Sequence, residues 1–538
     1  MATYYIDFDS GVDDPGRDGL SEAQAWQTFE YIVTRSAAAA GNRYLCKGTR
    51  TGQYTINSAF SGAQGQMTYF GRYGTGPNPV VISVASANNN ACLNISNLQW
   101  ITIEDFDLVG YGTATSSGIG AGIYGSWGSL GNGMVLRRIR VSRTKATGFD
   151  ISFTNLSAPP TYGMRNLVID GCRTEYTGFH GFNLTGRVDG AIVTGCTALY
   201  SGQITDGYGF STVSAMTTIG TSGWTNSSGT VYSRALSNPA NYSGTPAGVL
   251  GVVLGNKNAN SGNGYLSLTE NTGTPTTPGA GEFGYSAATL YINIGVAPSS
   301  VSGFSMKVMV GRCSATFINC RAAYTKRISV EGHGFVADDM SRGVFRGCLA
   351  EYNEGGGFTS HKGVGTVIAG NVARFNAAFG VRLLGSDSTI VINNTLISNG
   401  PYGVQCSGSA DYSGGCVIDN NGIIGHTTAI YSWNAKNTAT NNGLFGNTAS
   451  FADGIASGGG DVTTNPTLNA QSEITASSTW AGAGVTHGPY LDKRGKPLAA
   501  TPSIGAYEVQ STRPALASAR VAVGTARSVL GGNRAARY

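Results

Sequence analysis

The chain has 538 residues, of which 80 are glycine and 12% are charged, and its formal net charge is +5. This glycine-rich, charge-poor composition favours short strands joined by many turns over long helices. The small net charge, without a dense Lys/Arg stripe in the main body, argues against nucleic acid as a partner. The sequence contains no run of about 18 apolar residues and no signal-peptide pattern, so we expect no membrane span and no leader.

Residues 1–60 are expected to form an N-terminal cap and the first coils of the fold. This segment is rich in glycine and aspartate, the aspartates being Asp7, Asp9, Asp13, Asp14 and Asp18. Calcium binding is one interpretation, but the spacing lacks the terminal Glu of an EF-hand loop. A capping turn is the preferred interpretation, since Asp and Gly favour turns for conformational reasons. We therefore predict no cofactor, with calcium as the alternative.

A sequence repeat begins near residue 170. Its anchors are a Cys or an Asn, at Cys172, Cys196, Cys320, Cys348, Asn371 and Asn394, and the last three steps are 28, 23 and 23 residues. A small residue follows two positions later, and an aromatic residue four positions later, at Tyr176, Tyr200, Tyr324, Tyr352 and Phe375. This alternation predicts a strand with one buried face, on which Tyr324 would be a core residue. The period predicts one such strand per turn, stacked on its counterpart in the next turn.

A second landmark has the same period. Glycines at 181, 209, 334, 357, 380 and 403 each precede Phe or Val, and three successive steps are 23 residues. Together the two registers predict an all-β fold, a right-handed parallel β-helix over about residues 90–450. Asn353, Asn376 and Asn399 recur at the same step and are interpreted as stacked side chains that close turns. The nine cysteines are interpreted as small buried residues, because they lack the spacings of disulfide or zinc sites.

The repeat is interrupted once. Cys196 and Cys320 are 124 residues apart where one coil should suffice, so residues 214–306 are expected to form an inserted antiparallel β domain between the rod segments 61–213 and 307–508. The last part of segment 307–508 is expected to be a C-terminal cap. In the insertion, Trp224 and Tyr232 are candidates for stacking on sugar rings, and the alternative is that they form the core of the domain.

Residues 509–538 follow the last expected coil. Arg513, Arg520, Arg527 and Arg534 recur every 7 residues, but the paired apolar positions of a coiled coil are missing. We predict an extended arm, which resembles the arginine-punctuated terminal repeats of some phage structural proteins and would bind a neighbouring subunit. A disordered basic tail is the alternative.

The glycine register also brings charged residues together. Asp206, Glu331 and Glu354 each lie three residues before a register glycine, so they are predicted to form a column with about 4.8 Å between coils. His180 and His333 lie one residue before theirs and should share the same face. Further candidates on the neighbouring part of these coils are Asp338, Asp339, His361, Lys362, Arg382 and Asp387.

Such a column suits polysaccharide chemistry. Stacked carboxyl groups cannot all ionise cheaply, so one should keep its proton and act as a general acid beside an ionised partner, as glycoside hydrolysis requires. The candidate catalytic residues are Asp206, Glu331, His333, Asp338, Glu354 and His361, and the candidate substrate-binding residues include His180, Lys362, Arg382 and Asp387. A lyase would instead use Lys362, Arg382 or His361 as base and cation. Ordinary charged side chains on a solvated face are the alternative.

The repeat, the opening phrase YYIDFDSGVDDPGRDGLSEAQAWQTFEYI and the late phrase PSIGAYE resemble the pectate-lyase-like β-helix superfamily over about residues 3–508. The resemblance specifies the fold strongly and the chemistry weakly. With the basic arm, it predicts a phage tailspike or tail-fibre type protein of the virion, a homotrimer that binds and depolymerises a bacterial surface polysaccharide. A free polysaccharide lyase or glycoside hydrolase, secreted or at the cell surface, and a non-catalytic attachment protein are the alternatives.

Overall fold

The computed structural model describes most of the chain. The described residues are 1–76, 78–82, 91–110, 120–153, 155, 163–219, 222–236, 251–254, 267–300, 306–329, 331–339, 341–386, 388–406, 414–433, 436–469, 471–487, 491–494 and 496–508. The predicted arm at 509–538 and the candidate residue Asp387 lie outside the described residues.

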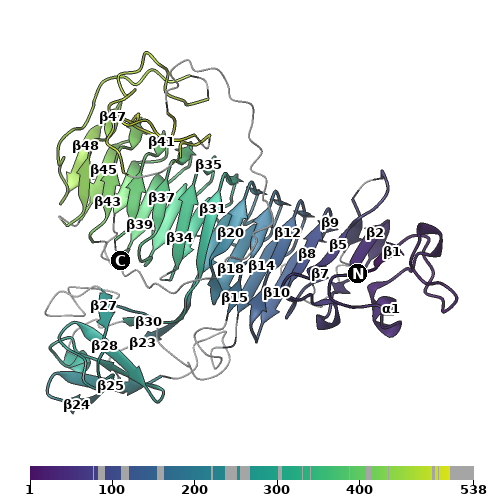
Figure 1. Cartoon of the computed structure of the whole chain (residues 1–538). Helices are drawn as coiled ribbons and strands as arrows, with labels where there is room; N and C mark the ends of the chain where they lie inside the picture. The colour runs from purple at the N-terminus through teal and green to yellow at the C-terminus, as the bar shows by residue number, and fades with distance from the viewer. Residues whose placement is uncertain are drawn as a thin grey trace.

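Strands dominate the described ranges. They stack coil upon coil into a rod, as Figure 1 shows, and form three long parallel sheets, named here A, B and C. The helices are short: η1 (Glu22–Gln24), α1 (Phe29–Thr34), η2 (Ser58–Phe60) and η3 (Pro298–Ser300). No helix among the described residues is long and apolar enough to cross a lipid bilayer.

Each coil contributes one strand to each long sheet, and the order within a sheet follows the chain. Sheet A contains β1 (Thr3–Asp7), β2 (Arg43–Lys47), β5 (Thr68–Arg72), β8 (Ile101–Glu104), β12 (Met134–Arg137), β16 (Val168–Asp170), β20 (Ala191–Thr194), β31 (Ser314–Ile318), β34 (Arg342–Arg346), β37 (Val367–Ala369), β40 (Ile390–Ile392), β43 (Val417–Asp419) and β46 (Thr438–Thr440). Sheet B contains β3 (Thr49–Thr51), β6 (Val80–Ile82), β9 (Asp107–Val109), β13 (Arg140–Ser142), β17 (Arg173–Glu175), β21 (Thr197–Leu199), β32 (Arg321–Ala323), β35 (Leu349–Glu351), β38 (Val372–Arg374), β41 (Thr395–Ile397), β44 (Gly422–Ile424) and β47 (Gly443–Phe445).

Sheet C carries the candidate site. Its strands are β4 (Tyr54–Thr55), β7 (Leu93–Asn94), β10 (Ile123–Trp127), β14 (Phe149–Phe153), β18 (Phe182–Gly186), β22 (Phe210–Val213), β33 (Phe335–Asp338), β36 (Phe358–His361), β39 (Phe379–Leu384), β42 (Tyr402–Cys406), β45 (Thr428–Ser432) and β48 (Ala449–Asp453). A short parallel sheet beside the rod joins β11 (Gly131–Asn132), β15 (Met164–Arg165) and β19 (Val188–Asp189).

Both predicted registers are confirmed. In sheet B, Arg173 pairs with Thr197 and Thr197 with Arg321, so the cysteine anchors that precede them are stacked. In sheet C, Phe210 pairs with Phe335 and Phe335 with Phe358, as the glycine register requires. The rings of these three phenylalanines stack in the interior with centroids 4.8 and 4.9 Å apart. The core of the rod is therefore built from columns of like residues.

The predicted aromatic stack exists, but its expected burial was wrong. Ring centroids are 5.0 Å apart between Tyr200 and Tyr324, and 5.6 Å apart between Tyr324 and Tyr352. Tyr324 is nevertheless 38% exposed and Tyr352 is 45% exposed. The reason is the backbone, because Tyr324 has a φ of 59°. This left-handed conformation turns the chain immediately after the strand, so the two-residue alternation ends and the ring points outward.

A small, mainly antiparallel sheet is present in the insertion, as predicted. Its strands in spatial order are β23 (Ala215–Ile219), β30 (Met306–Gly311), β26 (Gly251–Leu254), β27 (Ser267–Glu270), β28 (Glu282–Ser286), β29 (Thr289–Ile292), β25 (Val231–Ala235) and β24 (Thr225–Ser228). Figure 1 shows this sheet projecting from the side of the rod. The rod continues across the insertion without a break, because β20 pairs directly with β31.

The chain folds back on the rod after the last coil. Trp480 is 1% exposed and occupies the space beside Gly422 and Gly443, where a Cβ would lie 2.6 and 2.5 Å from its ring. Further along, the Ala506 N–H donates to Thr395 Oγ1 at 2.9 Å, which fixes the IGAYE segment against sheet B. The end of the described chain thus covers part of the rod.

Candidate functional site

Side chains on the outward face of sheet C and on the turns before its strands lie in register columns. The first column runs along the positions before the register glycines, with Phe379 paired to Tyr402. The second contains Thr359, Arg382 and Gln405. The third contains Asp338, His361 and Leu384. In β39, Arg382 and Leu384 alternate with the buried Val381 and Leu383, so the second and third columns point away from the interior. The first column lies where the strands begin, and its Phe379 is almost fully buried.

Glu331 and His333 form the centre of the site. The Glu331 Oε2 atom lies 2.8 Å from Nε2 of His333, whose side chain is 1% exposed. The Gly356 N–H donates to His333 Nδ1 at 2.8 Å, so Nδ1 carries no proton and Nε2–H donates to Glu331. Burial lowers the pKa of His333, which is therefore neutral near pH 7. A buried histidine thus orients the carboxylate.

The Glu331 carboxylate is ionised at neutral pH. Burial raises the pKa of Glu331, but the hydrogen bond from His333, the charge that His333 carries when it is protonated in acid, and the charge of Arg382 outweigh this and lower it overall. Arg382 Nη2 lies 3.8 Å from Glu331 Oε2 and 3.0 Å from His333 Nε2. Burial lowers the pKa of Arg382, but a guanidinium keeps its charge. Glu331 is therefore a base or nucleophile in this arrangement, rather than the protonated acid.

Tyr208 completes the cluster, and the sequence reasoning missed it. Its ring stacks on His180 with centroids 4.7 Å apart and faces His333 at 6.0 Å. Burial raises the pKa of Tyr208, and the charges of Glu331 and Asp338 and a hydrogen bond to Glu331 raise it further. The phenol therefore keeps its proton and donates to Glu331. The sequence did contain a signal for Tyr208, because Tyr208 directly precedes the register glycine Gly209, just as His180 directly precedes Gly181.

A second acid–histidine pair lies on the neighbouring column. Asp338 Oδ1 is 2.9 Å from His361 Nδ1, and both side chains are about one quarter exposed, at 21% and 25%. The negative charge of Asp338 acts on Glu331, Tyr208 and Arg382, which places it within electrostatic range of all three. Lys362 directly follows β36 in a left-handed conformation. We call Glu331, His333, Arg382, Tyr208 and Asp338 the Glu331 cluster.

The other two carboxylates of the predicted column have different partners. Asp206 Oδ1 accepts from the backbone N–H groups of Ile328 and Ser329 at 2.5 and 2.7 Å. Glu354 Oε2 accepts from the Arg327 N–H at 3.0 Å. Both therefore fix the loop that follows Tyr324, whereas Glu331 turns towards His333. The structure brings together Glu331, His333, Asp338, His361 and Arg382, with His180 beside Tyr208.

The aromatic candidates of the insertion lie against its own core. Trp224 and Tyr232 are partly buried and contact a cluster of apolar residues that includes Leu290 and Ile292. Tyr232 is on β25, which pairs with β29 through Ile292. Their predicted role in sugar stacking is untested.

A polar ladder continues the second column towards the N-terminus. Ser211 Oγ donates to Asn183 Oδ1 at 2.8 Å, and Asn183 Nδ2 donates to Asp150 Oδ1 at 3.0 Å. Burial raises the pKa of Asp150 despite the hydrogen bond from Asn183. These three residues occupy three successive coils of the second column, and Val336 separates them from Thr359 and Arg382. The sequence reasoning did not single them out.

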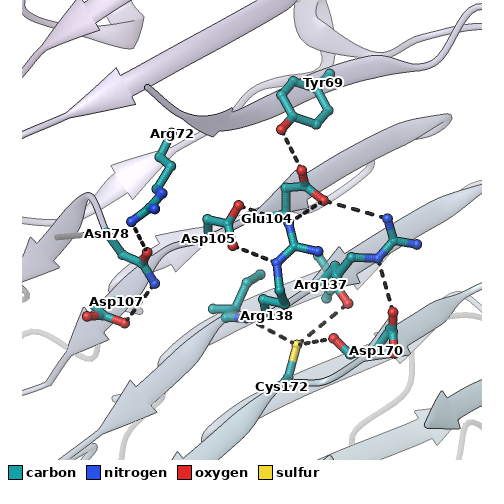
Figure 2. Close-up of polar contacts among 12 residues, drawn as sticks. Tyr69, Arg72, Asn78, Glu104, Asp105, Asp107, Arg137, Arg138, Asp170 and Cys172 are labelled. Atoms are coloured by element: carbon teal, nitrogen blue, oxygen red, sulfur yellow. Dashed lines mark hydrogen bonds and ion pairs between the residues drawn. The ribbon is translucent and has the colours of Figure 1, made fainter. Parts of the chain in front are cut away.

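A separate polar cluster lies near the N-terminal end of sheet A (Figure 2). Glu104 accepts from the Tyr69 hydroxyl at 2.5 Å and lies 3.1 Å from Arg138 Nη2. Arg138 also forms a two-pronged ion pair with Asp105, at 2.7 and 2.9 Å. Arg137 Nε lies 3.1 Å from Asp170. This arrangement pairs each acid with an arginine, which is the pattern of a structural ladder.

The N-terminal aspartates act as turn residues. Asp13 accepts from the Gln27 and Thr28 N–H groups at 2.8 and 3.1 Å, and Asp14 accepts from the Gly16 N–H at 2.6 Å. Among the described residues no group of three or more His, Cys, Asp or Glu side chains is arranged to hold a metal ion. These contacts agree with the capping interpretation.

Comparison with known proteins places the fold. A family described as "Right handed beta helix region" matches residues 307–470. No curated protein matches the sequence. Similar solved structures include the catalytic domain of Agl-KA, at 12% identity over 86% of this chain and 68% of that chain, with a TM-score of 0.48. The AlgE6 A-module of Azotobacter vinelandii mannuronan C-5 epimerase is 12% identical over 86% of this chain and 100% of that chain, with a TM-score of 0.46. Pectate lyase Pel9A is 14% identical over 95% of this chain and 97% of that chain, with a TM-score of 0.42.

The chain is accordingly an all-β protein with the right-handed parallel β-helix fold, as the repeat predicted. It carries an inserted sheet and a site of buried, oriented polar groups on one face. The family match names no activity, so the activity has to be argued from the Glu331 cluster itself.

Proposed function

We propose that this protein binds a bacterial surface polysaccharide along sheet C and cleaves it at the Glu331 cluster. The observation that carries the proposal is the ionised Glu331 carboxylate, held by a buried neutral His333 at 2.8 Å beside a guanidinium and a protonated phenol. Ionisable groups that are buried and oriented in this way are typical of functional sites, because burying them costs free energy that folding alone does not offset.

The cluster supplies the parts that glycan cleavage requires. Glu331 acts as base or nucleophile, the Tyr208 phenol donates a proton to the leaving oxygen, and Arg382 stabilises developing negative charge. Elimination beside a uronate uses Glu331 to remove the proton and Arg382 to neutralise the carboxylate. Hydrolysis uses Glu331 with Asp338 as the second carboxyl group. The two reactions are distinguished by their products, since only elimination leaves an unsaturated sugar.

We further propose a virion role of the tailspike or tail-fibre type, in which a homotrimer recognises the host capsule. Support comes from the sequence of the arm, with an arginine every 7 residues from Arg513 to Arg534, which suits binding to another tail or capsid protein. A free-standing lyase or hydrolase would be monomeric by light scattering and independent of phage particles. An attachment protein without catalysis would bind glycan and release no product.

The test is the variant Glu331→Gln on a panel of purified bacterial capsular polysaccharides. Cleavage, measured as new reducing ends and as unsaturated uronate, should fall about 100-fold or more, since the base or nucleophile is lost. The fold should survive, because the amide oxygen of Gln still accepts the His333 Nε2–H. Glu22→Gln, an exposed carboxylate near the N-terminus, is the matched control. Unchanged cleavage in Glu331→Gln would refute the proposed chemistry.

A further inference from the structure

The three columns of the site continue beyond it into three aromatic residues. Phe379 pairs with Tyr402 in the first column, and Gln405 pairs with Tyr431 in the second. Leu383 pairs with Cys406, and Cys406 pairs with Ser432, in the buried position beside the third column. Trp433 follows Ser432 as Leu384 follows Leu383, so Trp433 has the place of the third column on its coil. Tyr431 and Trp433 thus lie on the same outward face as Arg382, two coils further along, which is about 10 Å. Tyr402 lies one coil further along than Arg382.

These rings differ from the other exposed aromatics of the rod. Trp433 is 52% exposed, while Tyr402 and Tyr431 are half-buried. The rings of Tyr402 and Tyr431 are 5.0 Å apart and tilted by 50°, so neither covers the face of the other. In the Tyr176–Phe375 ladder, by contrast, neighbouring rings are nearly parallel, for example 2° between Tyr176 and Tyr200, and their faces are occupied by each other.

The aromatic group is also held in place. The Trp433 Nε1–H donates to the Tyr431 hydroxyl, and that hydroxyl is hydrogen-bonded to Asp453 on the next strand. Neighbouring aromatic rings that are partly exposed and fixed by polar contacts form a contiguous apolar surface, which is typical of a binding site. The C–H face of a pyranose ring is the matching chemistry, because it is flat and weakly polar while its hydroxyls remain free to bond neighbouring groups.

We propose that Tyr402, Tyr431 and Trp433 form an aromatic subsite for a pyranose ring of the polymer cleaved at the Glu331 cluster. The polysaccharide then runs along the rod axis, from Glu331 past Arg382 and Gln405 to Trp433. The coil spacing allows about two sugar rings between Arg382 and Trp433. This inference rests on the proposed function and adds the direction of the chain and a binding contact remote from the chemistry.

The experiment uses the full chain on an array of bacterial polysaccharides, followed by titration with the polymer that is retained. In Trp433→Ala the dissociation constant and KM should rise about tenfold or more, as for a truncated aromatic anchor, while kcat stays within about twofold. Tyr431→Phe, which keeps the ring, should change them less. Tyr176→Ala, an equally exposed ring in the ladder, is the matched control.

The outcomes separate the two proposals. Wild-type binding with unchanged KM in Trp433→Ala would overturn the subsite and leave the cleavage proposal standing. Failure of the wild type to bind any polysaccharide would overturn both. Intrinsic fluorescence gives an independent readout, since Trp433 is exposed, Trp100 and Trp224 are partly buried, and Trp26, Trp127 and Trp480 are buried. Glycan binding should change the emission of the wild type, and Trp433→Ala should lose that change.

Discussion

At the scale of single residues, the candidate site depends on histidines that burial keeps neutral. His180 Nδ1 accepts the Tyr208 N–H at 3.1 Å, and His333 Nδ1 accepts the Gly356 N–H in the equivalent place two coils later. In both, the backbone of the next coil fixes the tautomer and leaves Nε2–H as donor. For His333 that donor is used to hold Glu331, which links the stacking of coils directly to the chemistry.

Because His180 is buried, it makes the free energy of unfolding decrease in acid. Burial lowers the pKa of His180 to about 3 in the folded state, against about 6.5 in an unfolded chain. Between these values the unfolded state binds one more proton, so the stabilisation present above pH 6.5 is lost as the pH falls, by about 1.4 kcal/mol per pH unit.

The variant His180→Gln should remove this slope. Urea unfolding between pH 7 and pH 4 should show its free energy of unfolding falling less steeply than that of the wild type, so that the two curves converge in acid. Above pH 7 the curves should run parallel, which serves as the internal control. Equal slopes between pH 6 and pH 4 would contradict the buried neutral His180.

At the scale of elements, two kinds of aromatic column coexist. The interior column through Phe210, Phe335 and Phe358 has fully buried rings, whereas the Tyr324 column lies at the turn after sheet B and is partly exposed. Stacking is common to both, but only the interior column removes whole rings from water. Burial, rather than stacking, should therefore determine how much each column stabilises the rod.

Paired alanine variants test this difference. Phe358→Ala should reduce the free energy of unfolding by about 3–5 kcal/mol, as expected for a phenylalanine removed from a core. Tyr324→Ala should cost about 1 kcal/mol, the range of an aromatic pair contact. Urea unfolding of both proteins measures the difference. A cost for Tyr324→Ala equal to that of Phe358→Ala would show that the exposed column is part of the core.

The repeat made the fold predictable, because identical positions in successive coils have identical neighbours. The Cys–Asn anchors and the register glycines place strands that are far apart in the chain, such as β20 and β31, side by side. The outward turn of Tyr324 was missed, since a two-residue pattern carries no information about a left-handed residue at its end. Likewise, the column position of Glu331 was readable from the sequence, but its rotation towards His333, away from Asp206 and Glu354, depends on side-chain contacts.

At the scale of the whole molecule, the rigidity and the length of the site follow from the stacked coils of the rod. Sheet C presents one continuous outward face, and each coil adds one position to each column. The segment around Trp480 and Ala506 covers another side, against sheet B, and leaves the face of sheet C to the site. This geometry supports the proposed polysaccharide partner, since the repeat units of a long polymer can contact successive coils.

The most direct test of the central claim is a crystal structure of Glu331→Gln soaked with an oligosaccharide from the polymer that the protein retains. Our account predicts sugar rings along the outward face of sheet C, with a glycosidic oxygen near residue 331 and Tyr208, and another ring against Trp433. An oligosaccharide bound to the inserted sheet or to the Tyr176–Phe375 ladder, with the Glu331 cluster empty, would contradict it.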